Sequence, residues 1–210
     1  MKLSYLFSRC LTADYRHVED GASYALSRTG NTLTVFLECS NGAVDWLNNL
    51  DFPARAHLRK GKRAYFCHRG FLRVFSSLLP YVAEAVESKL YRRIECVGYS
   101  HGAALAVLLH EYIWECRPDL REGGLFSWGF GCPRVLWGVY TSAFLDRFRE
   151  FTVVRNPDDA VTHLPPALLG YRHVGQMLTV GERGKYSGTD AHRPENIKAE
   201  LLSYERTLGI

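Results

Sequence analysis

The chain lacks the features that mark several common classes of protein. Its 210 residues contain no apolar run near the roughly 20 residues that a membrane-spanning helix needs. The six cysteines are dispersed without a C-x-x-C pair, and their spacing does not fit a metal site. No phosphate-binding glycine loop occurs, and a net charge of +4 is too small for a strong polyanion-binding field. We therefore expect no metal, no cofactor and no nucleic-acid partner.

The chain also has few signals that would divide it or direct it elsewhere. It has no repeat, no low-complexity segment and no linker, and the first ten residues are too polar and too short for a secretion leader. Several cysteines fall in apolar runs, where a reduced thiol behaves as a small apolar side chain. These features predict one domain over residues 1–210 and a cytoplasmic location.

What the chain does contain is an alternation of strand and helix signals. Strands are predicted at residues 22–27, 33–37, 64–67, 94–97, 124–130, 151–155 and 171–180, and helices at residues 71–90, 139–148 and 193–208, with a further helix ending near residue 116. The alternation predicts an α/β fold with a central, mostly parallel sheet and helices on both faces.

Two local features bear on this assignment. Residues 57–69 hold five lysines and arginines and are predicted to be a basic loop, either a solvated face or a contact for an anionic surface. Pro80 lies inside the predicted helix at residues 71–90 and is expected to kink or divide it.

The most informative stretch is Gly98-Tyr99-Ser100-His101-Gly102, which lies between an apolar strand and a helix of small apolar residues. Such a Gly-x-Ser-x-Gly turn holds one hydroxyl at its apex, at strained backbone angles. A Cβ at Gly98 or Gly102 would strike the neighbouring strand or helix. The placement predicts that Ser100 is a nucleophile at a helix N-terminus, where an oxyanion is favoured.

A serine nucleophile needs a histidine to accept its proton and a carboxylate to orient the imidazole. In this class of fold the acid follows the serine along the chain and leaves a neighbouring strand. Asp158 and Asp159 both meet this condition. A turn-capping carboxylate is the favoured interpretation of Asp158.

Three histidines follow the candidate acids. His163 is close behind them and just before a proline, as expected of a rim residue, whereas His173 lies within a predicted strand. His192 lies in a loop before the last helix and can reach the serine, so we favour His192 as the base. The oxyanion donors are expected to be the His101 backbone N–H and an N–H of the loop near Ser40.

Several ordered segments resemble the class 3 (fungal-type) triacylglycerol lipases, which have the α/β-hydrolase fold. The similarity covers about residue 22 to the C-terminus. It rests on Phe36-Leu37-Glu38-Cys39-Ser40 followed by Asp45-Trp46-Leu47, on His68-Arg69-Gly70-Phe71-Leu72, on Gly131-Cys132-Pro133-Arg134, on Asp159-Ala160-Val161-Thr162-His163-Leu164-Pro165-Pro166 and on Gly170-Tyr171-Arg172-His173. Glu38 and Cys39 depart from the family's Arg-Gly before the oxyanion residue.

The resemblance implies a role for each matched position. It makes Ser100 the nucleophile, Asp159 the acid and His192 the base, with Ser40 and His101 at the oxyanion hole. It also implies a short lid near residues 43–50. Its apolar residues Trp46, Leu47 and Leu50 are expected either to contact the acyl chain or the interface, or to pack within the protein.

The resulting prediction is a serine ester hydrolase (a lipase or esterase) that acts on lipid acyl esters and contacts a lipid interface transiently. A phospholipase or a small-ester carboxylesterase would use the same residues. A non-catalytic binding module of the same fold is the alternative from another class, supported by Glu38. The oligomeric state is left open.

Overall fold

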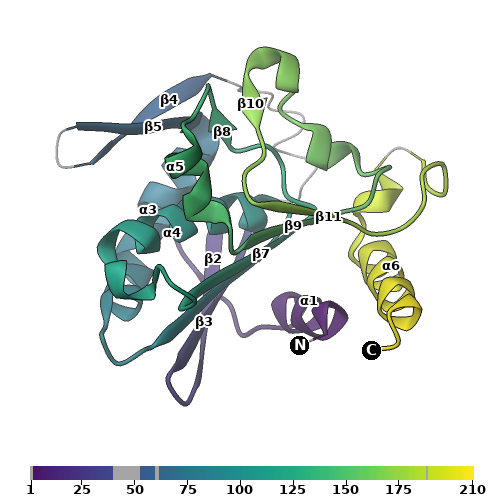
Figure 1. Ribbon diagram of the computed structural model, residues 1–210, viewed down its shortest axis with the longest axis horizontal. Coiled ribbons are helices and arrows are strands. Elements are labelled where there is room, and N and C mark those ends of the chain that lie inside the picture. Colours follow the sequence, from purple (N-terminus) through teal and green to yellow (C-terminus); the bar gives the residue numbers. More distant parts are fainter. Residues whose placement is uncertain (1, 40–52, 60–61, 188) are drawn as a thin grey trace.

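The computed structural model describes residues 2–39, 53–59, 62–187 and 189–210. Its centre is a seven-stranded sheet in which the five strands from β3 to β11 are parallel (Figure 1). At the other edge, β2 pairs antiparallel with β3, and β1 pairs antiparallel with β2. In spatial order the strands are β1 (Arg16–His17), β2 (Ala22–Thr29), β3 (Thr32–Cys39), β6 (Arg93–Tyr99), β7 (Leu125–Phe130), β9 (Phe151–Arg155) and β11 (Gln176–Thr179). The predicted mostly parallel sheet is confirmed.

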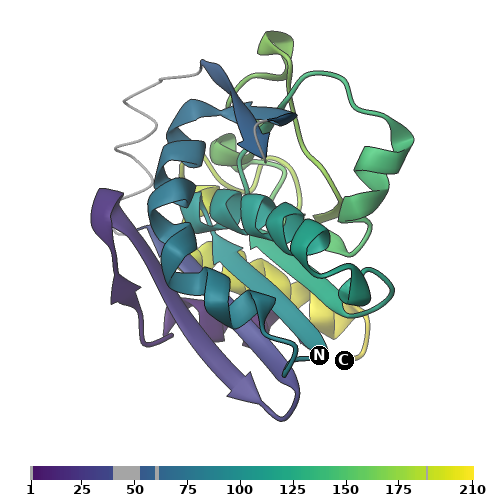
Figure 2. The same ribbon diagram turned by 90° about the vertical axis from the view of Figure 1, so that its left-hand side faces the viewer.

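Helices cover both faces of this sheet, because its buried strands direct apolar side chains to both sides. Helices α3 (Arg69–Glu87) and α4 (His101–Cys116) pack on one face, over side chains such as Val35 and Cys96. Helices α1 (Leu3–Leu11) and α6 (Pro194–Thr207) lie on the other, where Phe36 and Val97 are buried. Figure 2 shows α3 and α4 in front of the sheet and α6 behind it.

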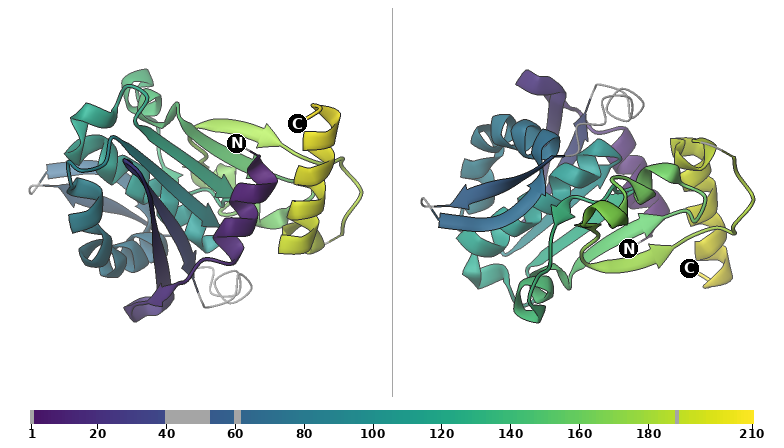
Figure 3. Two further views of the ribbon diagram at one scale, coloured as in Figure 1. Left: turned by 90° about the horizontal axis from the view of Figure 1, so that it is seen from below. Right: turned by 90° about the horizontal axis from the view of Figure 1, so that it is seen from above.

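The two ends of the chain meet on the second face, where α1 and α6 lie side by side (Figure 3). The buried Glu205 carboxylate of α6 accepts hydrogen bonds from the backbone N–H of Ser4 at 2.8 Å and from its hydroxyl at 2.5 Å. These bonds hold α6, and with it the loop that leads into α6, against the sheet.

A second, smaller sheet lies beside the first and corrects the predicted basic loop. Residues 57–69 belong largely to a hairpin of β4 (Ala54–Arg59) and β5 (Lys62–His68), which continues into β8 (Leu136–Trp137) and β10 (Tyr171–Arg172). The basic residues obscured the strand pattern because an edge hairpin needs apolar side chains on only part of its length.

Three further expectations differ from the structure. Pro80 does not divide helix α3, which continues through it as one helix. Pro80 and Ser76, whose carbonyl loses its usual partner, are both exposed to solvent. The helix predicted at residues 139–148 is only α5 (Ser142–Leu145) with a following 3-10 turn. The strand predicted at residues 171–180 is divided between the two sheets, at Gly175 with φ +82°.

The remaining elements are short 3-10 turns, at η1 (Glu19–Gly21), η2 (Pro118–Leu120), η3 (Asp146–Phe148), η4 (Ala160–His163), η5 (Ala167–Leu169) and η6 (Asp190–His192). Among the described residues, no helix combines the length and apolarity needed to cross a bilayer.

Candidate active site

The candidate nucleophile lies where β6 turns into α4. Ser100 has φ +56° and ψ −120°, outside the usual regions for a residue with a side chain. A Cβ at Gly98 would lie 2.2 Å from the Gly102 carbonyl oxygen, and one at Gly102 would lie 2.0 Å from the Leu37 carbonyl oxygen. Both glycines are therefore required by close packing, as predicted, and the end of β3 lies against the turn.

The structure brings the three predicted side chains together in one hydrogen-bonded chain. Ser100 Oγ is 2.8 Å from His192 Nε2, and His192 Nδ1 is 2.8 Å from Asp159 Oδ2. All three are buried, at 5% exposure for Ser100, 4% for His192 and none for Asp159. Because an ionised carboxylate only accepts hydrogen bonds, the neutral imidazole donates from Nδ1 and Nε2 is left to accept the serine proton.

The acid is held by the turn that follows β9. The Val161 N–H donates to Asp159 Oδ1 at 2.9 Å, so one oxygen caps η4 and the other faces His192. The Thr162 hydroxyl donates to the Asp159 carbonyl oxygen at 2.8 Å, and His173 Nε2 lies 2.8 Å from the Thr162 carbonyl oxygen. His173 thus braces the acid loop from behind.

Asp158 points elsewhere and has a different task. Its two carboxylate oxygens accept from the N–H groups of Gly184 at 2.9 Å and Tyr186 at 3.0 Å. These hydrogen bonds lower the pKa of Asp158. The turn-capping interpretation of this residue is confirmed, and the loop that it caps leads to His192.

Tyr99, which the sequence reasoning did not single out, contacts the candidate base directly. Its ring is stacked on the imidazole of His192, with the centroids 5.2 Å apart and the planes at 25°. Its hydroxyl donates to the His192 carbonyl oxygen at 2.6 Å. Burial raises the pKa of Tyr99, helped by the Asp159 carboxylate, so the phenol stays a donor. Its place directly before the nucleophile was the available signal.

The Gly131–Arg134 segment supports the same site from the end of β7. Gly131 has φ +58°, and a Cβ there would lie 2.7 Å from Cε1 of His192. The Arg134 backbone N–H donates to the Leu164 carbonyl oxygen at 2.7 Å, and its guanidinium donates to the carbonyl oxygens of Pro165, at 3.0 Å, and His163. His163 therefore serves through its backbone, at the rim.

The predicted oxyanion residues are described only in part. His101 is the first residue of α4, directly after Ser100, and its buried ring lies 5.1 Å from that of Phe71. Burial lowers the pKa of His101 to about 4, assisted by His68, so the ring is neutral at pH 7. Glu38 is half-buried at the end of β3, and burial raises its pKa, partly offset by His17.

Four predicted residues lie outside the described part of the chain: Ser40, Trp46, Leu47 and Leu50. Among the described residues, no group of three or more histidine, cysteine, aspartate or glutamate side chains is placed to hold a metal ion. The hydrogen bonds from Ser100 through His192 to Asp159 suit the arrangement to activate a serine hydroxyl in a buried site.

Comparison with known proteins gives consistent matches. The family model for lipase (class 3) matches residues 34–169. A secreted mono- and diacylglycerol lipase of Malassezia restricta is 31% identical over 149 residues, which cover 66% of this chain and 44% of that protein. A lipase of Rhizomucor miehei is 24% identical over 163 residues, covering 75% and 44% of the two chains. The chain thus spans less than half the length of these curated relatives.

Solved structures agree on the fold. The triacylglyceride lipase of Rhizomucor miehei superposes with a TM-score of 0.68 at 20% identity, covering 80% of this chain and 66% of that one. A lipase of Yarrowia lipolytica gives a TM-score of 0.60 at 14% identity, with coverages of 80% and 65%. The α/β-hydrolase fold predicted from the resemblance is confirmed.

The predicted cytoplasmic location is wrong, because the curated relatives from Malassezia restricta and Malassezia globosa are described as secreted. The cysteine argument fails for a physical reason. Cys96 is a free thiol, and burial raises its pKa to about 12, so it is protected as an unreactive thiol in an oxidising medium too.

Proposed function

Since the chain belongs to the class 3 lipase family, we propose that it is a serine hydrolase that cleaves the acyl esters of lipids. One observation carries the proposal: the buried chain of hydrogen bonds from Ser100 through His192 to Asp159. A buried serine–imidazole–carboxylate chain at the start of a helix is the arrangement that acyl transfer requires. We also propose that residues 1–210 form a single domain.

The first half of the reaction forms an acyl-enzyme. His192 Nε2 accepts the proton of the Ser100 hydroxyl while Oγ attacks the ester carbonyl carbon. The Asp159 carboxylate stabilises the imidazolium that forms. When the tetrahedral intermediate collapses, the C–O bond to the alcohol breaks and His192 gives its proton to the departing alkoxide oxygen.

The second half returns the enzyme to its starting state. Water attacks the acyl carbon, His192 takes one of its protons, and the bond to Ser100 Oγ breaks as that oxygen regains a proton. Each tetrahedral intermediate carries an oxyanion. Helix α4 begins directly after Ser100, so the backbone N–H groups of its first turn are available to stabilise that charge. The N–H of His101 is the donor that we assign there, and the N–H near Ser40 is assigned as the second.

The substrate class follows from what the relatives share. Those from Malassezia are named for mono- and diacylglycerols, and the Rhizomucor structure for triacylglyceride. The glycerol acyl ester is common to these names, so we propose a glycerolipid ester reached by transient contact with a lipid surface. The segment with Trp46, Leu47 and Leu50 is the proposed acyl contact.

The test is hydrolysis of a panel of substrates by the wild type and by Ser100→Ala. The panel holds nitrophenyl esters of increasing acyl length, mono-, di- and triacylglycerols, and phosphatidylcholine vesicles. We expect turnover of acylglycerols that Ser100→Ala abolishes and that the exposed control Ser203→Ala retains. Turnover of phospholipid alone would replace the proposal with a phospholipase. Equal inactivity of wild type and Ser100→Ala would favour a binding module.

A further inference from the structure

The loop that leads to the candidate base projects from the main sheet between β11 and α6, at the right of Figure 1. Of residues 181–187, six are exposed and Tyr186 is half-buried. Apolar burial therefore does little to fix this loop, although His192 must stay within hydrogen-bond distance of both Ser100 and Asp159. The contacts that hold the loop are polar ones.

Two carboxylates supply these contacts, and the first belongs to the acid turn, residues 156–159. Asp158 accepts hydrogen bonds from the backbone N–H groups of Gly184 and Tyr186. Within the turn, the Asp158 N–H donates to Asn156 Oδ1 at 2.9 Å and the Asp159 N–H donates to the Asn156 carbonyl oxygen at 3.1 Å. The acid turn is therefore tied to the base at two points, at the imidazole through Asp159 and at the loop through Asp158.

The second carboxylate is Glu200 of α6. Its Oε1 accepts hydrogen bonds from Lys185 Nζ at 2.5 Å and from the Tyr186 hydroxyl at 2.7 Å. Glu200 is 4% exposed, whereas the Lys185 side chain is 53% exposed. Burial raises the pKa of Glu200, but the hydrogen bonds from Lys185 and Tyr186 outweigh burial and leave that pKa below its ordinary value. The carboxylate is therefore ionised at pH 7 and accepts charge-assisted hydrogen bonds.

These contacts close the segment that carries the base into a ring. His192 lies between Tyr186 and Glu200 along the chain, and the hydroxyl of Tyr186 donates to the carboxylate of Glu200. Gly181, at the start of the loop, has φ +88°, and a Cβ there would lie 2.8 Å from Asn156 Nδ2 and 2.9 Å from Glu200 Oε2. The start of the loop is thus packed closely against both the acid turn and Glu200.

The competing explanation is that Glu200 only fixes α6 to the rest of the protein. Glu205 already does this from the same helix, because its carboxylate accepts hydrogen bonds from α1. The two side-chain donors to Glu200, by contrast, both come from the loop that precedes His192. Its contacts therefore act on the position of the base.

We propose that Glu200 is a positioning residue for His192, which closes the segment around the base into a ring that Asp158 fastens to the acid turn. The imidazole is then held at its distances from Ser100 and Asp159 before substrate arrives. This role rests on the proposed hydrolase function, for which it names the groups that keep the base in place. Loosening the ring should lower kcat and leave KM unchanged, because these contacts act on the reacting groups and not on bound substrate.

The experiment compares Glu200→Leu with Glu95→Leu, which removes another buried carboxylate. Glu95 is 7% exposed and, like Glu200, accepts from one cation and one hydroxyl, those of Arg93 at 2.8 Å and Thr34 at 3.1 Å. For a nitrophenyl ester we expect kcat to fall about 10- to 100-fold in Glu200→Leu, with KM within about twofold, and to stay within about twofold in Glu95→Leu. Glu200→Gln keeps an oxygen for both donors and should recover most of the rate.

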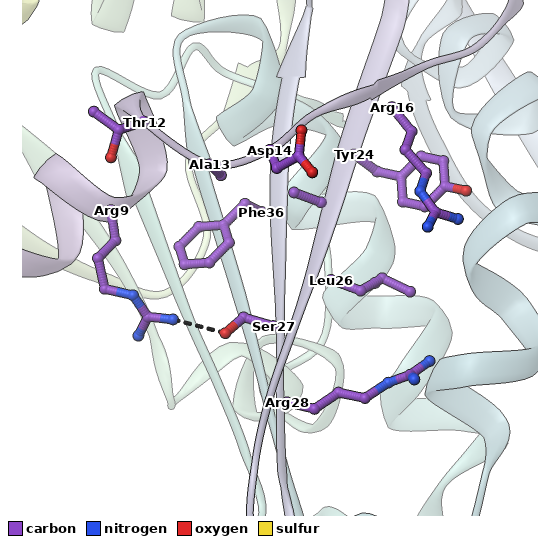
Figure 4. A pocket seen from close by; sticks show the side chains of 11 residues that line it. Arg9, Thr12, Ala13, Asp14, Arg16, Tyr24, Leu26, Ser27, Arg28 and Phe36 are labelled. Atoms are coloured by element: carbon purple, nitrogen blue, oxygen red, sulfur yellow. Dashed lines mark hydrogen bonds between the residues drawn. The ribbon is translucent and has the colours of Figure 1, made fainter.

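A milder set of variants tests the same contacts from the loop and the acid turn. Lys185→Met removes one donor to Glu200, and the control Arg9→Met removes the 2.9 Å hydrogen bond from Arg9 to the Ser27 hydroxyl, shown in Figure 4. Asp158→Ala releases the loop from the acid turn. We expect kcat to fall about 2- to 10-fold in Lys185→Met and Asp158→Ala and to be unchanged in Arg9→Met. Neither loop variant removes a fully buried group, so both are expected to fold even where Glu200→Leu does not.

A measurement without substrate separates this role from the proposed function. The proton between His192 Nδ1 and Asp159 should give a ¹H NMR resonance far downfield of the backbone amides, which shifts or broadens in Glu200→Leu but not in Glu95→Leu. A wild type that shows this pattern but cleaves no ester would overturn the proposed function and support the placement of the imidazole by Glu200. An unchanged kcat and resonance in Glu200→Leu, or an equal loss of kcat in both leucine variants, would overturn the positioning role.

Discussion

Replacing Gly131 with alanine should disable the candidate site while leaving the fold in place. A Cβ at this position would lie 2.7 Å from Cε1 and 2.9 Å from Nδ1 of His192, and 3.2 Å from Oδ2 of Asp159. The imidazole must retreat by about 0.7 Å to reach an ordinary 3.4 Å contact. A shift of that size lengthens at least one of the two 2.8 Å hydrogen bonds of the imidazole.

The magnitude follows from geometry. A misplacement approaching 1 Å lowers catalytic rates on the order of 100-fold, so we expect kcat/KM for a nitrophenyl ester to fall by about that factor. The backbone at φ +58° adds a stability loss of about 1–2 kcal/mol for a residue with a side chain. For a domain of this size that loss lowers the Tm by roughly 2–8 °C.

Gly123 provides the matched control. It has φ +78°, and a Cβ there would meet nothing within 4 Å. Gly123→Ala therefore carries the backbone strain alone, and we expect a similar fall in Tm with kcat/KM unchanged. If Gly131→Ala keeps kcat/KM within twofold of the wild type, the close approach to the imidazole has no part in catalysis and the reasoning is refuted.

Three other substitutions test parts of the same account. Tyr99→Phe keeps the stacked ring but removes the 2.6 Å hydrogen bond to the His192 carbonyl; kcat should fall about 2- to 10-fold with KM unchanged, and an unchanged kcat would exclude a positioning role. Arg134→Ala removes the guanidinium that clamps the segment after the acid. Its free energy of unfolding should drop by about 1–3 kcal/mol in urea titration, and no drop would contradict the clamp. His110→Gln removes a buried imidazole, the pKa of which is lowered by burial to about 4.

For His110 the direction of the pH effect is set by the unfolded chain. There the imidazole binds a proton near pH 6.5, whereas in the folded protein it stays neutral down to about pH 4. Both states are neutral above pH 7, so its penalty is absent there and grows as the pH falls through 6.5. The free energy of unfolding should therefore decline from pH 6.5 to 5 by up to about 1.4 kcal/mol per unit from this residue. His110→Gln should show a shallower decline by urea titration, and equal slopes would contradict the assignment.

The sheet and the turn at Ser100 could be predicted because local sequence determines both. The alternation of strand and helix signals indicated the layers, and the small residues Gly98 and Gly102 are demanded by backbone atoms less than 2.5 Å from their would-be Cβ positions. Chain order and loop placement then favoured His192 over His173, which instead lies against the Thr162 carbonyl.

The missed features depend on partners far away in the sequence. The hairpin of β4 and β5 is completed by β8, which follows it by about 70 residues. The contact between Tyr99 and His192 joins residues 93 apart, and the Arg134 clamp on Pro165 spans 31. No local pattern reports such contacts, since a tyrosine in that turn or an arginine after a proline suits many environments.

The most direct test of the central claim is covalent labelling of the nucleophile. A fluorophosphonate should form one adduct per chain, located at Ser100 by mass spectrometry of the digested protein, with loss of esterase activity in proportion to labelling. The adduct should be absent in Ser100→Ala and form at least 100-fold more slowly in His192→Ala, because the serine then lacks its base. An adduct on a different residue, or full esterase activity with no adduct, would contradict the account.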